Sequence, residues 1–390
     1  MLKALSSIAL ACSLLPALST PARADADADF TKGDWSAAQS GWSIALQADP
    51  KNAAALLGLA RLALYADRRP EAERLAGSIP PSDPLAPKAA ALITEAKRRE
   101  ADLDPANLSV PSEGTRVPFA LTDPLPVLKV RVNDKADAFF LLDTGASEAV
   151  LDPEFATELG IASSAAGNGI FAGGKTAAVR TATLDSLALG AARITHLPVK
   201  VVPTRGFKLD ADHRLDGIIG TGVLYRFLST IDYPKGELIL RPRDASADFE
   251  RKALAEKAIV APLWLVGDHF LFTRARLNDG PERYFNVDTG GAGVGVMASP
   301  ATIADSHVTL DTAHAGEGQG GGGMVKLVPF SAAITLQGVE QTGVPGMYTP
   351  EGNQYGIFPF ETGGSLSHLY FHTHALTFDF VAMKLVLEKP

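Results

Sequence analysis

The pattern of apolar and polar positions changes period along the chain. Between residues 30 and 100, alanine and leucine recur at helical spacing, as at Ala55 and Leu59. Farther along, apolar positions alternate as they do in strands. Residues 127–132 have the pattern of one strand, an Asn-Asp turn signal follows, and residues 138–142 form a second apolar run. The pattern predicts a helical region followed by a larger β region.

The helical region contains a repeat. Asp49-Pro50 recurs as Asp83-Pro84, a shift of 34 residues, and Ala38 recurs as Ala72 at the same shift. The prolines end one helix and allow the next to begin. A 34-residue period built from helix pairs resembles the tetratricopeptide repeat. So short an array either offers a groove to a peptide or protein partner or packs as an appendage on the next domain, and both remain open.

The β region contains two copies of one pattern. The turn Asn133-Asp134 and the triplet Asp143-Thr144-Gly145 both recur 145 residues later, as Asn278-Asp279 and Asp288-Thr289-Gly290. The strand pair that closes the first copy, at residues 231–240, recurs 147 residues later. These displacements predict tandem duplication of an all-β unit. The fold class is therefore mainly β, with a small helical domain in front.

The duplicated triplet suggests a pair of catalytic acids. Peptide hydrolysis without a metal, cysteine or serine needs an activated water and a proton donor. Two facing carboxyl groups supply both, because like charges a few ångströms apart cannot both ionise cheaply and the pair shares one proton. The ionised carboxylate takes a proton from the water, and its protonated partner donates to the substrate carbonyl. Asp143 and Asp288 are the candidate pair, and Gly145 and Gly290 permit their close approach.

At these residues the chain resembles the retropepsin-like aspartic proteases, over roughly residues 117–390. The resemblance implies two tandem β lobes that form an intrachain pseudo-dimer. It also implies peptide-bond hydrolysis by a water held between Asp143 and Asp288, one from each lobe, with no cofactor and no metal. Because one chain supplies both halves, a monomer suffices. The partner is then a peptide or protein substrate.

The resemblance also assigns the residues around the pair. The implied supports of the active-site loops are Thr144, Gly145, Ala146, Thr289, Gly290 and Gly291. The two threonines can place hydroxyl groups across the axis between the loops. A β-hairpin flap is expected over the cleft, and its candidate tips are Gly173, Gly174, Gly320 and Gly321.

The second copy departs from the family pattern below its active-site loop. In the first copy, residues 216–220 supply the expected hydrophobic-hydrophobic-glycine segment, whereas a displacement of 147 brings Ser365-Leu366-Ser367 to the equivalent place. We expect the second loop to rest on a more polar support. The alternative function is therefore a catalytically weak or inactive peptide-binding scaffold with the same fold.

Composition and histidine spacing bear on three other functions: nucleic-acid binding, cysteine chemistry and metal binding. A formal net charge of −8 without a long basic run disfavours nucleic acid as a partner. The single cysteine, Cys12, leaves the rest of the chain without a disulfide, a thiolate nucleophile or a cysteine metal site. His368, His372 and His374 could bind a metal, but no carboxylate or cysteine lies in the usual place. We expect them to be ordinary loop and helix histidines.

The N-terminus has the pattern of a secretory signal peptide. Lys3 precedes an apolar run over residues 4–18, and Ala22-Arg23-Ala24 offers a small-x-small cleavage site. We expect an exported protein, periplasmic or secreted, with no transmembrane span after signal removal. A lipoprotein attached through Cys12 is the minor option. The expected divisions are a signal peptide (1–24), a helical domain (25–103), a linker (104–116), a first lobe (117–244), a linker (245–257) and a second lobe (258–390).

Overall fold

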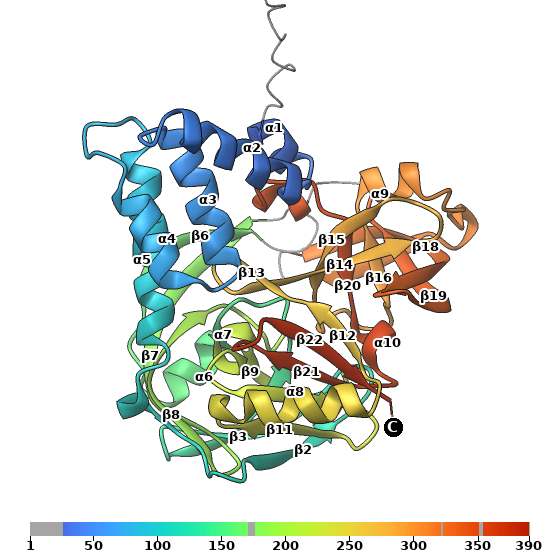
Figure 1. Cartoon of the computed structure of the whole chain (residues 1–390). Helices are drawn as coiled ribbons and strands as arrows, with labels where there is room; N and C mark the ends of the chain where they lie inside the picture. Colours follow the sequence, from blue (N-terminus) through green and yellow to red (C-terminus); the bar gives the residue numbers. More distant parts are fainter. Residues whose placement is uncertain (1–25, 171–175, 321–322, 351–353, 390) are drawn as a thin grey trace, which may run out of the picture.

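The computed structural model describes residues 26–170, 176–320, 323–350 and 354–389. The expected signal peptide, Cys12 and the candidate flap residues Gly173, Gly174 and Gly321 lie outside the described residues. The described chain is mainly β, with helices gathered at its N-terminal end (Figure 1). The expected fold class is confirmed at this level.

Five helices form the N-terminal region: α1 (Ala26–Thr31), α2 (Trp35–Ala48), α3 (Ala53–Tyr65), α4 (Arg69–Gly77) and α5 (Ala86–Ala101). The side chains of Asp34 and Asn52 cap α2 and α3, because each accepts a hydrogen bond from a backbone N–H in the first turn. Among the described residues, no helix is long and apolar enough to cross a membrane.

The strands of the β region fall into two series with the same pairing order. The first series is β3 (Val127–Val132), β4 (Ala136–Leu142), β9 (Leu215–Ile219), β5 (Ala149–Leu151), β8 (Ala192–Val201), β7 (Thr176–Leu189) and β6 (Ser164–Ile170). The second series is β14 (Phe270–Leu277), β15 (Glu282–Val287), β20 (Gly364–Leu366), β16 (Val296–Ala298), β19 (Val339–Tyr348), β18 (Gly323–Leu336) and β17 (Gly316–Gly320). The sequence repeat is therefore also a repeat of topology. Below, residues 117–244 are called the first half and residues 258–390 the second half.

A further group of strands joins the halves. Its order is β12 (Ile259–Pro262), β22 (Lys384–Glu388), β21 (Ala375–Asp379), β10 (Leu228–Asp232), β11 (Glu237–Arg241) and β2 (Thr115–Leu121). Here β10 and β21 lie antiparallel, and the hydroxyl groups of Thr230 and Thr377 are 2.7 Å apart. Thr377 lies 147 residues after Thr230, so this pair sits where the two copies meet.

One hydrophobic cluster spans both halves and includes Phe140, Tyr225, Phe285 and Phe378. A second cluster joins the helices to the second half. In it the ring of Trp35 stacks on that of Tyr284 at 3.8 Å, and Phe360 meets the edge of Trp35 at 4.9 Å. The aromatic face of α2 is therefore covered by the chain itself.

The segments expected to be linkers carry structure of their own. Residues 104–116 include the 3-10 helix η1 (Pro105–Asn107), β1 (Leu108–Ser109) and the start of β2. Residues 245–257 include α8 (Ser246–Ala255), which lies against the central strands in Figure 1. Ser246 donates to Asp379 Oδ2 at 2.7 Å, which ties α8 to the end of β21.

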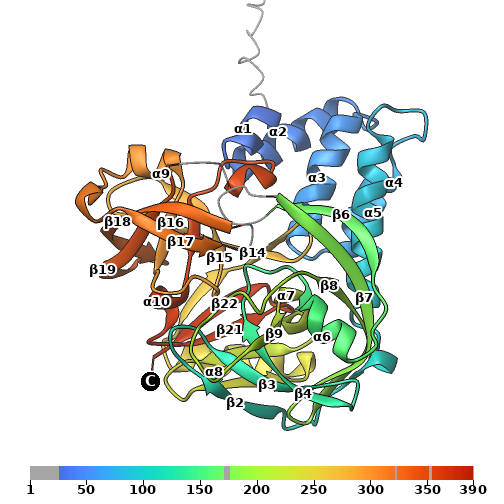
Figure 2. The same ribbon diagram turned by 180° about the vertical axis from the view of Figure 1, so that it is seen from behind.

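Two long hairpins, β6–β7 and β17–β18, occupy equivalent places in the two halves. Figure 2 shows β6–β7 rising from the first half toward the helices. The remaining helices are short: α6 (Pro153–Glu158), α7 (Thr221–Leu224), α9 (Pro300–Asp305) and α10 (His368–Phe371).

Candidate active site

Each candidate aspartate follows a strand that is held by a parallel neighbour. Asp143 follows β4, and its N–H donates to the carbonyl of Ile219 at the end of β9 (3.1 Å). Asp288 follows β15, and its N–H donates to Leu366 at the end of β20 (2.9 Å). The strand pairs β4–β9 and β15–β20 are both parallel. The duplicated strands therefore present the two acids in the same way.

The two threonines of the triplets hold the loops together across the axis. The N–H of Thr144 donates to Thr289 Oγ1 at 3.0 Å, and the N–H of Thr289 donates to Thr144 Oγ1 at 3.1 Å. Each hydroxyl also donates to a carbonyl of the opposite half, that of Thr144 to Val287 at 2.7 Å and that of Thr289 to Leu142 at 3.3 Å. Both side chains are completely buried. These reciprocal bonds fix the separation of the loops.

The glycines bring the two carboxyl groups together. A Cβ atom on Gly145 would lie closer than 3.0 Å to the carboxylate of Asp288, and one on Gly290 closer than 3.0 Å to that of Asp143. Each acid also accepts a hydrogen bond from the glycine of its own triplet, at 2.8 Å in the first loop and 3.0 Å in the second. The structure thus places Asp143 and Asp288 against each other with no room for a side chain between the loops.

The electrostatics favour one shared proton. Both aspartates are half-buried. Burial, and then the negative charge of Asp288, raise the pKa of Asp143 well above its ordinary value of 3.8, while burial raises the pKa of Asp288. Such a pair titrates as a unit, so its singly ionised form persists over a wide pH range.

Both loops rest partly on a hydroxyl group, and Thr221 Oγ1 supplies it for the first loop by donating to the carbonyl of Thr144 at 3.2 Å. Under the first loop, the carbonyl of Ala146 accepts from the N–H of Thr221 at 2.9 Å. Under the second, Ser367 Oγ accepts from Gly291 N at 3.1 Å and donates to the carbonyl of Asp288 at 2.6 Å. The polar support expected for the second loop is present, and its hydroxyl holds both sides of the turn.

Tyr233 is a residue near the pair that sequence reasoning missed. It is buried, and its hydroxyl has no hydrogen-bond partner among the described residues. Burial and the negative charges of Asp143 and Asp288 raise the pKa of its phenol. Its position directly after β10 carried no local signal, because a tyrosine beside a strand is ordinary core composition. Of the candidate flap tips, only Gly320, at the end of β17, lies among the described residues.

The three spaced histidines do not form a group of metal-ligand atoms in the described part of the chain. His368 begins α10, and its ring centre lies 6.2 Å from that of His372. Burial lowers the pKa of His368.

A group of side chains with ligand chemistry lies elsewhere, at Glu95, Asp268 and His269. The guanidinium of Arg98 contacts all three, with its Nη2 atom 3.2 Å from His269 Nδ1. The positive charge that a metal ion would bring is therefore already supplied by an arginine.

Two family models match parts of the chain. Residues 128–223, which include Asp143 and end before Asp288, match the family model described as aspartyl protease. The resemblance to the aspartic proteases is confirmed. Residues 30–96 match the model described as tetratricopeptide repeat, which confirms the resemblance of the helical region. No curated protein matches the chain.

Several solved structures are similar to the chain. A retropepsin-like aspartic protease from Rickettsia conorii shares 25% identity over 34% of this chain and 92% of its own, with a TM-score of 0.26. An aspartic proteinase from Irpex lacteus shares 15% identity over 71% of this chain and 97% of its own, with a TM-score of 0.40. Basic 7S globulin from soybean shares 11% identity over 72% and 94%, with a TM-score of 0.42.

Proposed function

We propose that the chain is an aspartic-type endopeptidase in which Asp143 and Asp288 activate one water molecule between them. The observation that carries this proposal is the reciprocal approach of the two loops, in which each carboxylate lies against the glycine of the opposite triplet. The raised pKa of Asp143 supports it, because the pair needs one proton and one negative charge at the same time.

The proposed reaction needs no covalent intermediate. The ionised carboxylate takes a proton from the water as its oxygen bonds to the peptide carbonyl carbon, and the protonated carboxyl group donates to the carbonyl oxygen. When the tetrahedral intermediate collapses, the C–N bond breaks, the leaving nitrogen takes up the proton of the pair, and a hydroxyl group of the intermediate returns a proton to the other carboxylate as the C=O bond re-forms. The products are a carboxylic acid and an amine, and the dyad again holds one proton.

We expect the substrate to be an extended peptide. Hairpins β6–β7 and β17–β18 offer strand edges from both halves, and an extended peptide pairs with such edges through its backbone. Because Asp143 and Asp288 both come from this chain, the proposed active unit is a monomer.

Substitution of each acid tests the proposal. Asp143→Asn and Asp288→Asn keep the shape of the side chain but cannot take a proton from water, so each should abolish cleavage of a mixed peptide library. Asp212→Asn, at an exposed position of the first half, is the matched control and should cleave normally. Circular dichroism checks that all three variants fold. Cleavage at the wild-type rate by either dyad variant would rule the assignment out.

The peptide-binding scaffold remains the second candidate, and inhibitor binding separates the two. A statine-type transition-state mimic should bind the wild-type chain far more tightly than either Asn variant if the dyad is formed. Binding of peptides without cleavage, and with equal affinity in wild type and variants, would favour the scaffold.

A further inference from the structure

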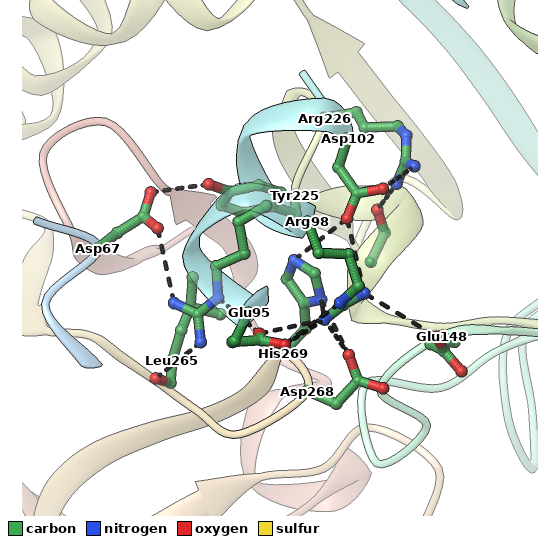
Figure 3. Close-up of polar contacts among 12 residues, drawn as sticks. Asp67, Glu95, Arg98, Asp102, Glu148, Tyr225, Arg226, Leu265, Asp268 and His269 are labelled. Atoms are coloured by element: carbon green, nitrogen blue, oxygen red, sulfur yellow. Dashed lines mark hydrogen bonds and ion pairs between the residues drawn. The ribbon is translucent and has the colours of Figure 1, made fainter. Parts of the chain in front are cut away.

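The last turn of α5 lies where the helices meet both halves of the β region, and Figure 3 shows the side chains involved. Arg98 forms ion pairs with Asp268 of the second half and with Glu148 of the first half, the latter at 3.9 Å. Asp102, the C-cap of α5, forms an ion pair with Arg226 of the first half at 2.5 Å. One short stretch of helix therefore contacts both halves through charged groups.

A neighbouring arginine fixes α5 in this position. Arg99 is completely buried and donates to the carbonyl of Leu64 on α3 and to that of Gly267 in the second half, both at 2.8 Å. Its Nε donates to Glu95 at 2.9 Å. A buried guanidinium with its donors satisfied is a specific anchor, because moving the helix would leave a charge without partners.

A chain of contacts runs from Asp102 to the loop that carries Asp143. Arg226 donates to Asp102 with one nitrogen and to the carbonyl of Gly222 in α7 with another. The N–H of Gly222 donates to the carbonyl of Ser147 at 2.8 Å. Residues 143–148 are called the Asp143 loop below. Its far end is thus held by α7, and α7 is held by an arginine that the helical region neutralises.

We propose that the Asp102–Arg226 pair is a positioning device for the Asp143 loop, so that the helical region is part of the framework of the active site. This proposal rests on the proposed function of Asp143. The side chain of Arg226 is only 7% exposed, so removing its carboxylate partner leaves a buried charge that must find water or move. Either change loosens α7, and with it the bonds from Thr221 and Gly222 that hold the Asp143 loop.

The expected consequence is a loss of catalytic rate rather than of substrate binding. An acid displaced by about 1 Å loses roughly 100-fold in rate, because water and carboxylate no longer meet in line. We expect the peptide to be held mainly by strand edges, whereas Asp102 pairs with Arg98 and Arg226. In Asp102→Asn, kcat should therefore fall by roughly 10- to 100-fold while KM changes by less than about twofold.

Three variants and one control test the proposal in the full chain. Asp102→Asn removes the charge, Asp102→Glu keeps it, and Arg226→Lys keeps a charge but cannot reach both acceptors at once. Glu100→Gln, at an exposed position of the same helix, is the matched control. Hydrogen exchange of the amides of residues 219–224 and of the Asp143 loop is measured together with kcat and KM.

The expected result is at least tenfold faster exchange at these amides, with lowered kcat, in Asp102→Asn and Arg226→Lys. Asp102→Glu should recover part of both, and Glu100→Gln should resemble wild type. Should Asp102→Asn fail to fold, Arg226→Lys makes the same test. Unchanged exchange and unchanged kcat in both variants would overturn the proposal. If the wild-type chain cleaves no peptide, the proposed function fails. The hydrogen-exchange rates then test the positioning role by themselves.

Discussion

At the scale of single residues, the site consists of reciprocal pairs. Asp143 lies against Gly290, Asp288 lies against Gly145, and the two threonines exchange hydrogen bonds. Each residue of one triplet thus has its partner in the other. The residues that bring the carboxyl groups together also join the two halves. The protonation state of the two acids should therefore affect the free energy of unfolding.

The first prediction concerns stability and pH. Folding raises the pKa of both acids above 3.8, so the folded state binds protons more tightly than the unfolded chain. The stability contributed by this binding is fully present below the unfolded pKa and is lost as pH rises through the folded pKa. Asp288→Asn should therefore be more stable than wild type near about pH 8, and this advantage should vanish near about pH 3.

Urea unfolding at both pH values measures this difference, with Asp212→Asn, at an exposed position of the first half, as the matched control. A difference between Asp288→Asn and wild type that stays the same at both pH values would show that folding does not raise the pKa of Asp288.

The second prediction concerns the threonines. Thr144→Val keeps the shape but removes the hydroxyl that donates to Val287 and accepts from Thr289 N. It leaves two buried groups without partners, so the free energy of unfolding should fall by about 2–4 kcal/mol. Thr144→Ser keeps the hydroxyl and should lose much less. Calorimetry of the two variants makes the comparison, and equal losses would mean that the hydroxyl contributes little.

At the scale of elements, much of the β region was predictable from the sequence. The strand at residues 127–132 and the turn at Asn133 are confirmed, with Asn133 at φ 51° and its repeat Asn278 at φ 49°. Local signals sufficed there, because strand alternation and left-handed turn residues are properties of adjacent positions. The juxtaposition of Asp143 and Asp288 followed from the duplication.

Other features had no local signal. Arg98 and Arg99 look like the basic residues that commonly end a helix at the surface, yet Arg99 is completely buried. Its partners lie 35 and 168 residues away in sequence. The role of Ser367 could not be predicted for a similar reason, because its partners are distant in sequence. The sequence predicted a polar support, but only the fold shows the hydroxyl of Ser367 bridging Gly291 and Asp288.

The third prediction concerns the turn itself. Gly145→Ala inserts a methyl group closer than 3.0 Å to the carboxylate of Asp288, so the loops must separate. Peptide cleavage should fall by roughly 100-fold or more, because the acids no longer share a proton in line with the substrate. Gly206→Ala is the control in the same half, since nothing lies within 4 Å of the added methyl. The peptide cleavage rates of the two variants are compared, and a normal rate for Gly145→Ala would contradict the close approach of the two loops.

At the scale of the whole molecule, two sets of contacts, called seams below, join the helical region to the β region. One is aromatic, around Trp35 and Tyr284, and the other is ionic, around Arg98 and Arg99. The aromatic face of α2 and the last turn of α5 are therefore both occupied by the β region of the same chain.

The fourth prediction tests the aromatic seam. Trp35→Ala removes the ring that stacks on Tyr284 at 3.8 Å and leaves a cavity, so the free energy of unfolding should fall by about 3–5 kcal/mol. Ile44→Ala, also on α2 but 60% exposed, is the control and should change little. Limited proteolysis should cut Trp35→Ala first between residues 26 and 101. Equal stability of the two variants would mean that the seam does not hold the helices.

The fifth prediction concerns export, which we propose from the apolar N-terminal run and the Ala22-Arg23-Ala24 site. The mature chain should begin at about Asp25. Mass spectrometry of the protein recovered from the cell envelope and the medium checks this. A chain that keeps residues 1–24 in all fractions would contradict the proposal.

The central claim is that two carboxyl groups, one from each half, share one proton. Carbon-13 NMR of aspartate-labelled protein measures it directly, with each Asn variant used to assign the signals. We predict that Asp143 and Asp288 titrate in two separated steps, and that Asp288→Asn brings the pKa of Asp143 closer to its ordinary value of 3.8 because it removes the negative charge that raises it. Two independent titrations, each unchanged when the other acid is replaced, would contradict the account.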